Sequence, residues 1–399
     1  MKKYNLSTPW LIIAPHQLYP ARNGADIAID RIAKHLSTHV PYVDIICQKS
    51  IVRYEKGNYT VISSFDNKER SRLAAALRTI GFQSNYLFEK FNTSQFKKEA
   101  NEYLLANKFE NILFSYNTSI KIIDKVRLKQ SFNMVFTHND DYKYYADMKK
   151  KSSNPLIKLM ANASSNWLKQ LIDNHLSDFV FLHVTALDQE GYNEQNPGHI
   201  GLQLAIGADI DDELKYIDLV DKNAITISFI GSLHVKMNEY ALLNFQNKYN
   251  KPLNDEFSTR LKIRVAGSNP TPSVKEICSN NGWELFSNVS DDKMSELIQT
   301  STFTMMPFEY SNGTKLKFLY SISNGTPILA TSVFRNNEVE VPLCLFSDDP
   351  ADWVSHVREN YAGAGSVNNK LQIFELSKQF SWANSINNLL KDFNRIFSN

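Results

Sequence analysis

The stretch Met305–Ser332, MMPFEYSNGTKLKFLYSISNGTPILATS, contains two apolar strand patterns that flank a loop and a helix. The first strand runs into Pro307. Small polar residues and two lysines come next, namely Asn312, Gly313, Thr314, Lys315 and Lys317. The lysines open the predicted helix, and Asn324–Pro327 ends it because glycine and proline are common just beyond a helix. A strand–helix–strand unit of this kind builds a parallel sheet, with the glycine and both cations where the first strand passes into the helix.

The same alternation of short apolar runs and amphipathic helical patterns continues along most of the 399 residues. Strands are predicted at Trp10–Ala14, Val43–Cys47, Ile112–Ser115, Met134–Thr137, Val180–Val184, Ala224–Ile230, Lys262–Ala266, Phe303–Pro307, Pro327–Thr331 and Leu343–Phe346. Helices are predicted between them, among them Ala25–Ser37, Ser94–Leu105, Leu156–His175, Glu239–Tyr249, Ser273–Asn280 and Lys293–Thr300. This pattern predicts an α/β fold of doubly wound parallel sheets with helices on both faces.

A chain of this length exceeds what one hydrophobic core usually serves, so two domains of similar size are expected. We predict a first Rossmann-like domain at 1–205, a linker at 206–222 and a second Rossmann-like domain at 223–380. No sequence repeat relates the two halves. The final segment, 381–399, contains the amphipathic pattern FSWANSINNLLKDFNRIF, which predicts a helix packed on a sheet face rather than one that binds a partner.

Composition and charge narrow the class of protein. The chain is 43% hydrophobic and 22% charged, and its net charge of +2 comes without a long basic block, which argues against nucleic acid as a partner. The three cysteines have neither metal-ligand spacing nor an even number for disulfide pairing, as expected in a reducing cytoplasm. No stretch reaches the roughly 20 apolar residues of a membrane span. We therefore predict a cytoplasmic protein.

Three strand-to-helix junctions share one chemistry. They are PHQLYPARNGADIAIDRIAKHL with Gly24, ISFIGSLHVKMNEYALLNF with Gly231, Lys236 and Asn238, and the stretch around Gly313. At each junction a glycine permits close backbone approach, while the helix start offers free N–H groups and the positive end of its dipole. Taken singly, each junction is better explained as an ordinary turn with solvated lysines. Together they predict a diphosphate bound at the carboxyl ends of the strands, between the domains.

Other chemistries lack their signatures in this sequence. Neither GxxxxGK[ST] nor GxGxxG before a helix is present, which argues against ATP or GTP hydrolysis and against a nicotinamide dehydrogenase. Paired acidic residues occur at Asp140-Asp141, Asp211-Asp212, Asp291-Asp292 and Asp348-Asp349. These pairs lie at expected loops and helix starts, where carboxylates cap the helix, so we predict no metal site.

Taken together, these residues resemble the retaining GT-B glycosyltransferases of family four. The resemblance is clearest from Ile227 to Thr331, where IRVAGSNP, ELFSNVSDDKMSELIQTSTFTMMPF and NGTKLKFLYSISNGTPILAT follow the junction at Gly231 in the family's order. In the first half, NGADIAIDRIAKHL, FTHND and LQLAIGADID are similar to the first glycine loop, the acceptor-side histidine strand and the strand before the linker. The closing FSWANSINNLL is similar to the family's terminal helix, which crosses back to the first domain.

The resemblance implies a set of site residues. His138, near the sugar or acceptor hydroxyl, and Lys236, on the donor diphosphate, would be the catalytic residues. The donor-binding set would be Gly24, Gly231, Ser232, Asn238, Val289, Asn312, Gly313, Thr314, Lys315, Lys317 and Tyr320. Within it, Gly313 and Thr314 would offer backbone amides, and Ser232 occupies a position where many members carry arginine.

One departure leaves an alternative open. Many members have two glutamates eight positions apart here, and the second binds the nucleotide ribose. This sequence has Asn312 and Tyr320 in those positions, and tyrosine cannot offer a pair of carboxylate acceptors. The second hypothesis is therefore a subunit that retains the two-domain fold but has no catalytic activity. A nucleotide-sugar epimerase ranks last, because the junction lacks carboxylates for proton transfer.

The resemblance implies transfer of a sugar from a nucleoside-diphosphate sugar to a glycan or glycolipid hydroxyl, without cofactor or metal. Positive groups would stabilise the departing diphosphate. A bacterial surface polysaccharide or lipid-linked glycan is the acceptor class it implies. The segment DDYKYYADMKKKSSNPLIKLM combines aromatic and basic residues, which fits a solvated helix face or a peripheral contact with the inner face of the membrane. The sequence does not predict the oligomeric state.

Overall fold

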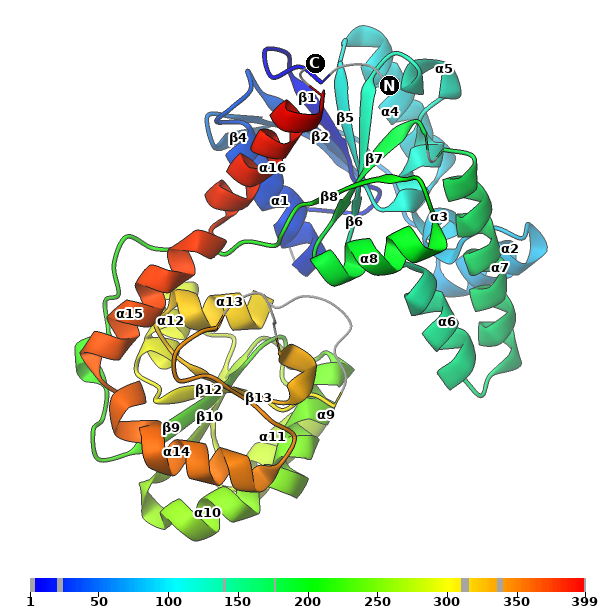
Figure 1. The fold of residues 1–399 in the computed structure, drawn as a ribbon. Helices are drawn as coiled ribbons and strands as arrows, with labels where there is room; N and C mark the ends of the chain where they lie inside the picture. Colours follow the sequence, from blue (N-terminus) through cyan, green and yellow to red (C-terminus); the bar gives the residue numbers. More distant parts are fainter. Residues whose placement is uncertain are drawn as a thin grey trace. The chain divides into compact units, whose positions relative to one another are not determined.

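The computed structural model describes residues 4–19, 24–138, 141–175, 177–309, 316–335 and 340–397. It divides into two compact units (Figure 1). Unit 1 comprises Met1–Ile206 together with Trp382–Asn399, and unit 2 comprises Gly207–Ser381. Within the described ranges, no helix has the combination of length and apolar character needed to cross a bilayer.

Unit 1 is built on one eight-stranded sheet with the order β4-β3-β2-β1-β5-β6-β7-β8. Its strands are β1 (Trp10–Ile13), β2 (Val43–Cys47), β3 (Ser50–Glu55), β4 (Asn58–Ser64), β5 (Asn111–Ser115), β6 (Phe132–Thr137), β7 (Phe179–His183) and β8 (Ile200–Gln203). In sheet order, the strands β2, β1, β5, β6, β7 and β8 are all parallel to their neighbours within this group. At the other edge, β3 pairs antiparallel with both β2 and β4. The carboxyl ends of the parallel strands therefore meet along one edge of the unit.

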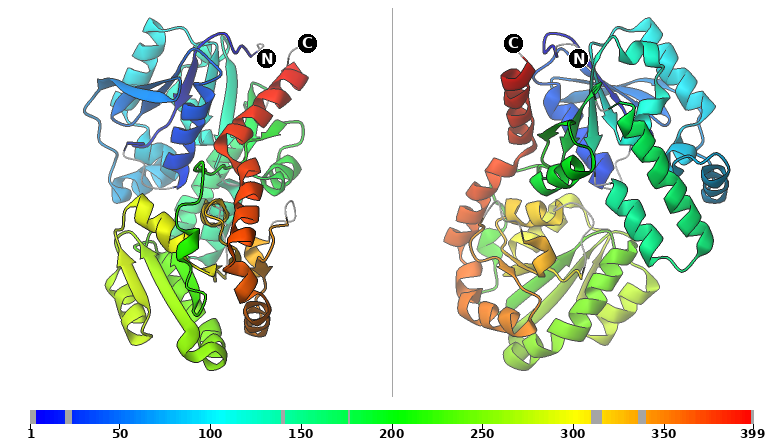
Figure 2. Two further views of the ribbon diagram at one scale, coloured as in Figure 1. Left: turned by 90° about the vertical axis from the view of Figure 1, so that its left-hand side faces the viewer. Right: turned by 45° about the vertical axis from the view of Figure 1, so that its right-hand side comes forward.

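Helices cover both faces of this sheet (Figures 1 and 2). The helices of unit 1 are α1 (Gly24–Leu36), α2 (Arg72–Gly81), α3 (Tyr86–Phe91), α4 (Ser94–Ala106), α5 (Lys125–Leu128), α6 (Asp141–Lys151), α7 (Pro155–Asp173), α8 (Ala186–Gln195) and α16 (Trp382–Phe397). On β1, Leu11 and Ile13 join the apolar cluster that contains residues of α4 and α7, whereas Trp10 faces the opposite side. Alternate side chains of a fully buried strand thus pack under helices on each face.

The C-terminal helix α16 packs in unit 1 beside α1 (Figure 2). Phe393 lies with its ring centroid 6.2 Å from that of Trp10 and 5.7 Å from that of Phe132. Trp382, Ile386 and Leu389 of the same apolar stripe are buried. The prediction that this helix packs on a sheet face is confirmed, and the chain therefore leaves unit 1 and returns to it.

Unit 2 contains a six-stranded sheet of order β11-β10-β9-β12-β13-β14, parallel throughout. Its strands are β9 (Ile225–Ile230), β10 (Leu261–Gly267), β11 (Glu284–Ser287), β12 (Phe303–Met306), β13 (Ile328–Ala330) and β14 (Leu345–Phe346). Its helices are α9 (Lys236–Asn244), α10 (Lys251–Phe257), α11 (Pro272–Asn280), α12 (Asp291–Gln299), α13 (Leu316–Ser323), α14 (Pro350–Ala364) and α15 (Val367–Ser377). The order reverses at β9 and β12, which places the switch point of the sheet beside the carboxyl end of β9.

The segment that follows Gly207 belongs to unit 2. The backbone N–H of Tyr216 donates to Oε1 of Gln299 at 2.8 Å, and Ile217 and Val220 are buried. On the same unit, Lys370 of α15 is fully buried, and its Nζ donates to the Ser301 carbonyl at 2.8 Å and to Thr326 Oγ1 at 3.0 Å.

Candidate active site

The carboxyl end of β9 in unit 2 requires glycine at position 231. Gly231 has φ +151°, and a Cβ built there would lie 2.6 Å from Nζ of Lys317 and 2.9 Å from its Cε. Behind it, a Cβ on Gly267 would come within 1.7 Å of the Gly231 carbonyl oxygen. The two glycines allow the ends of β9 and β10 to approach closely and leave room for a lysine side chain over Gly231.

Lys317, in the first turn of α13, fills that room. Its Nζ donates to Oδ1 of Asn238 and lies 4.7 Å from the ring centroids of Phe229 and of Phe308. Burial lowers the pKa of this ammonium to about 7. Among the residues that the structure describes, no carboxylate pairs with it.

Asn238 joins the two segments of this junction. While its Oδ1 accepts from Lys317, its Nδ2 donates to the Ser232 carbonyl at 2.7 Å. The amide therefore holds Lys317 and the loop after β9 in one fixed arrangement. The structure thus brings together four of the predicted donor-site residues, Gly231, Ser232, Asn238 and Lys317.

Lys236, predicted to be catalytic, makes a different contact. Its side chain is 70% exposed, and its Nζ donates to both oxygens of Glu239 at 3.1 Å. Burial raises the pKa of Glu239, but hydrogen bonds from Lys236, Ser273 and Thr271 bring it below its ordinary value. Lys236 is the first residue of α9, whose N-cap residue Val235 supplies no side-chain hydrogen bond. The helix start therefore lacks the usual side-chain acceptor for its N–H groups.

Of the remaining predicted donor residues, Gly24 begins α1 in unit 1, and the other six divide into two groups. Val289 and Tyr320 pack against the apolar cluster of Ile230, Ala266, Leu297 and Ile298, and burial raises the pKa of the Tyr320 phenol. Four of them lie outside the described residues, namely Asn312, Gly313, Thr314 and Lys315. Of the acidic pairs, Asp349 caps α14 by accepting from the Ala351 N–H at 2.8 Å, and Asp291 begins α12. No group of three or more His, Cys, Asp or Glu side chains in the described ranges could hold a metal ion.

His138 lies at the carboxyl end of β6 in unit 1, almost completely buried. Its Nε2 is 2.8 Å from Ser115 Oγ, and its ring stacks on Tyr116 with the centroids 4.2 Å apart. Burial, and then the nearby His16, hold the pKa of His138 well below its usual range, so the imidazole is neutral. Tyr116 has φ +69°, a strained conformation for a residue with a side chain, and such strain gathers at functional sites.

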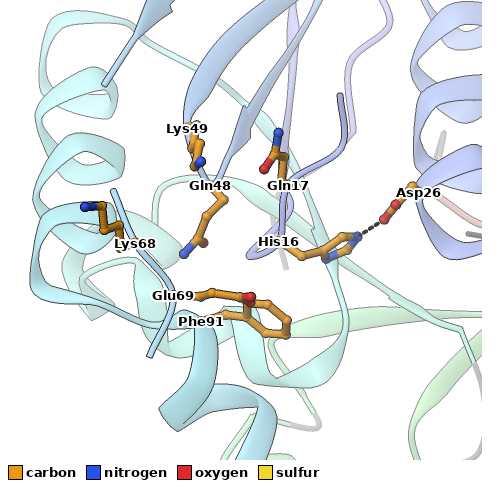
Figure 3. A pocket seen from close by; sticks show the side chains of 8 residues that line it. All are labelled: His16, Gln17, Asp26, Gln48, Lys49, Lys68, Glu69 and Phe91. Carbon is orange, nitrogen blue, oxygen red and sulfur yellow. Dashed lines mark ion pairs between the residues drawn. The ribbon is translucent and has the colours of Figure 1, made fainter. Parts of the chain in front are cut away.

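Beside His138, unit 1 has a hollow of about 480 Å³ that the sequence did not predict (Figure 3). Its lining residues are His16, Gln17, Asp26, Gln48, Lys49, Lys68, Glu69 and Phe91. His16 links it to His138, because the centroid of its ring lies 5.6 Å from that of Tyr116. Its Nε2 lies 2.8 Å from Oδ1 of Asp26, in the first turn of the helix that begins at Gly24. Spacing along the chain carried no signal for this hollow, since its residues come from five separate segments.

Known proteins are similar to this chain in sequence over part of its length and in fold over nearly all of it. Residues 224–362 match the family model described as glycosyl transferases group 1. A 44.6 kDa protein of the cps region of Klebsiella pneumoniae is 21% identical over 241 residues, which is 58% of this chain and 60% of that protein. This match thus covers less than two thirds of that relative.

Among solved structures, sucrose-phosphate synthase from Thermosynechococcus elongatus is similar, with TM-score 0.65 and 11% identity over 98% of this chain and 99% of that one. The catalytic domain of starch synthase IV from Arabidopsis thaliana, bound to ADP and acarbose, has TM-score 0.62 and 12% identity over 98% and 100% of the chains. Anabaena HepE in complex with UDP has TM-score 0.60 and 10% identity over 98% and 100%. At this level of identity these structures show the fold. The chain has the GT-B fold of these structures, and its residues 224–362 match the model of the glycosyl transferases of group 1.

Proposed function

We propose that this protein transfers a sugar from a nucleoside-diphosphate sugar to a hydroxyl of a surface polysaccharide or lipid-linked glycan, with retention and without a metal. The observation that carries the donor assignment is the ammonium of Lys317 at the Gly231 junction. By comparison, the fully buried Lys370 of unit 2 donates to a carbonyl and a hydroxyl. Lys317 has one amide oxygen and two aromatic rings. A partly buried cation with so few acceptors among the described residues is stabilised by an anion, and the diphosphate supplies one.

The chemistry follows from where charge develops. As the bond from the sugar C1 to the diphosphate oxygen breaks, the sugar becomes oxocarbenium-like and negative charge grows on the departing diphosphate. Lys317 and the start of α9 would stabilise that charge with groups already in place, and Lys236 would add a further cation. A neutral His138 would accept or donate a hydrogen bond at a sugar hydroxyl without adding charge there. The structures of HepE with UDP and of starch synthase IV with ADP support a nucleoside-diphosphate donor here.

A catalytically silent subunit remains the second candidate, because Tyr320 packs in an apolar cluster at the position where many relatives have a carboxylate. Calorimetric titration with UDP, ADP, GDP and dTDP separates the two. We expect one diphosphate to bind, and its sugar conjugates to release that diphosphate in the presence of EDTA. A protein that binds none of them is not a transferase. Release that requires a divalent cation would contradict the metal-independent mechanism.

The affinity for the diphosphate should depend on pH through Lys317. Its pKa of about 7 in the free protein rises when an anion binds, so binding favours the protonated form. The affinity for UDP is therefore greatest below about pH 7 and should fall as the pH rises through and above that value, by up to about tenfold per pH unit. Titration calorimetry from about pH 7 to about pH 9 measures this slope. The Lys317→Met variant should not show this pH dependence. An equal slope in that variant would exclude Lys317 as the source of the pH dependence.

We also propose that the α6–α7 hairpin contacts the membrane surface, since a lipid-linked acceptor lies there. The hairpin extends from unit 1 away from its sheet (Figure 1). At its tip Leu156, Ile157 and Leu159 are 59, 37 and 55% exposed. Residues 143–158 contain five lysines and one aspartate, a charge of +4 in a chain whose total is +2. Exposed apolar side chains among lysines are the pattern by which helices bind anionic lipid surfaces.

Sedimentation with lipid vesicles tests this contact. The protein should bind vesicles of equal parts phosphatidylglycerol and phosphatidylcholine and not vesicles of phosphatidylcholine alone. Replacing Lys150 and Lys158 together by glutamine should weaken binding about 30-fold, because each lysine near an anionic surface contributes about 1 kcal/mol. The matched control replaces Lys97 and Lys98 of α4, which are also exposed. Equal losses in the two double variants would contradict a specific role for the hairpin.

A further inference from the structure

The hollow of unit 1 contains a buried amide that makes no hydrogen bond with any described residue. Gln48 follows β2, is only 3% exposed, and has neither its side-chain Nε2 nor its Oε1 paired. Its backbone is fully engaged, since its N–H donates to the His16 carbonyl at 3.2 Å and its carbonyl accepts from Asn67 Nδ2 at 3.0 Å. A buried amide left unpaired costs about 1–3 kcal/mol, so a fixed Gln48 with a free amide indicates a polar ligand.

The surroundings of Gln48 indicate what kind of ligand. In Figure 3 its amide points into the hollow between the His16 side and the Phe91 ring. Planar polar side chains beside an aromatic ring suit a sugar, whose hydroxyls take hydrogen bonds while its C–H groups pack on the ring. The volume of about 480 Å³ lies within the range of small-molecule pockets.

With Lys90 counted, three lysines and two carboxylates lie at the hollow, which leaves a formal surplus of one positive charge, histidine apart. Asp26 lies beside His16, and Glu69 pairs with Lys90 at 3.3 Å. Lys49 and Lys68 line the same hollow, are exposed, and have no carboxylate partner among the described residues. The surplus is positive, and it favours a ligand that brings a negative charge.

We infer that this hollow binds an acidic pyranose, of the hexuronate class, with Gln48 on its hydroxyls and Lys49 toward its carboxylate. The inference rests on the proposed function in one respect, namely that this sugar is the acceptor end of the glycan. Successive ring contacts, from His16 to Tyr116 and from Tyr116 to His138, connect the hollow with the histidine that we propose to contact the sugar hydroxyl. As a binding site, the hollow consists of unit 1 residues alone.

Ligand-observed NMR with glucuronate and glucose as probes tests the inference. The wild-type protein should bind glucuronate about two- to fivefold more tightly than glucose, the advantage that one exposed ion pair supplies. Gln48→Leu should weaken both probes about tenfold. Lys49→Gln should remove only the preference for glucuronate. Lys97→Gln on α4 is the matched control and should change neither probe. Unchanged binding in Gln48→Leu, or equal binding of both probes to the wild-type protein, overturns the inference.

Two further readouts separate the ways in which the experiment can fail. The thermal unfolding midpoint of Gln48→Leu should equal or exceed that of the wild type, because the variant removes an unpaired buried amide; a clear fall would show that the amide has a structural partner and would overturn the inference. UDP titration of the same variant should match the wild type, since Gln48 lies in unit 1 and Lys317 in unit 2. Glucuronate binding without any nucleotide binding would refute the proposed function and keep this site.

Discussion

Replacing Lys317 by methionine should weaken UDP binding about 100-fold, the effect of losing charge-assisted hydrogen bonds to a phosphate. The same change should raise the free energy of unfolding. Lys317 is enclosed by Phe229 and Phe308 and has no described carboxylate partner, so its ammonium is destabilised in the folded protein. Methionine fills a similar space without that charge. Titration calorimetry measures the first effect, and chemical denaturation without ligand measures the second.

Lys236→Ala is the matched comparison, because Lys236 belongs to the same junction but lies in solvent with Glu239 as its partner. We expect this variant to fold normally and to lose turnover, with a smaller loss of UDP affinity than Lys317→Met. If Lys236→Ala lost more affinity than Lys317→Met, the diphosphate would lie at the start of α9 rather than over Gly231. Wild-type turnover in Lys236→Ala would remove Lys236 from the mechanism.

Gly267→Ala should destabilise the protein by about 3 kcal/mol, at the upper end of the usual cost of overpacking. The added methyl would come within 1.7 Å of the Gly231 carbonyl, which is backbone and cannot turn aside as a side chain would. Either the ends of β9 and β10 separate, or the strand hydrogen bonds between them are lost. Urea denaturation measures this change, and UDP affinity should fall with it because Gly231 positions Lys317.

Gly81→Ala is the control for this substitution. Gly81 is the last residue of α2, and a Cβ there meets nothing within 4 Å. Alanine should therefore be neutral or stabilise the protein by about 0.5 kcal/mol through its lower unfolded-state entropy. A similar loss in both variants would mean that the close approach at Gly267 has little energetic weight.

Much of the fold could be predicted because most strands are short apolar runs buried on both faces. All ten predicted strands are present, with ends shifted by at most two residues. The hairpin strand β4 was missed because all seven of its residues are exposed and it offers no apolar run. β8 has only one buried residue, Leu202, and contains Gly201, and β11 has none, so neither carries the pattern of a core strand.

The geometry of the Gly231 junction was predictable where it depends on the start and end of helices and strands. Gly231 and Asn238 could be singled out because a glycine after a strand and a helix start have a physical role on their own. The sequence could not decide between the lysines, since their reach depends on side-chain packing, and only the structure shows Lys317 over Gly231 and Lys236 on Glu239. The hollow around Gln48 joins segments separated by up to 75 residues, a proximity that no local pattern encodes.

The return of α16 to unit 1 has a consequence for the order of events during synthesis. Trp10 and Phe132 receive Phe393 only after all of unit 2 has been made. Domains generally fold as they emerge from the ribosome, the N-terminal one first. Unit 2 is formed by one continuous segment of the chain, whereas unit 1 lacks α16 until synthesis ends, so its apolar face stays exposed until then. Nascent chains halted before Trp382 should thus be the ones that chaperones capture.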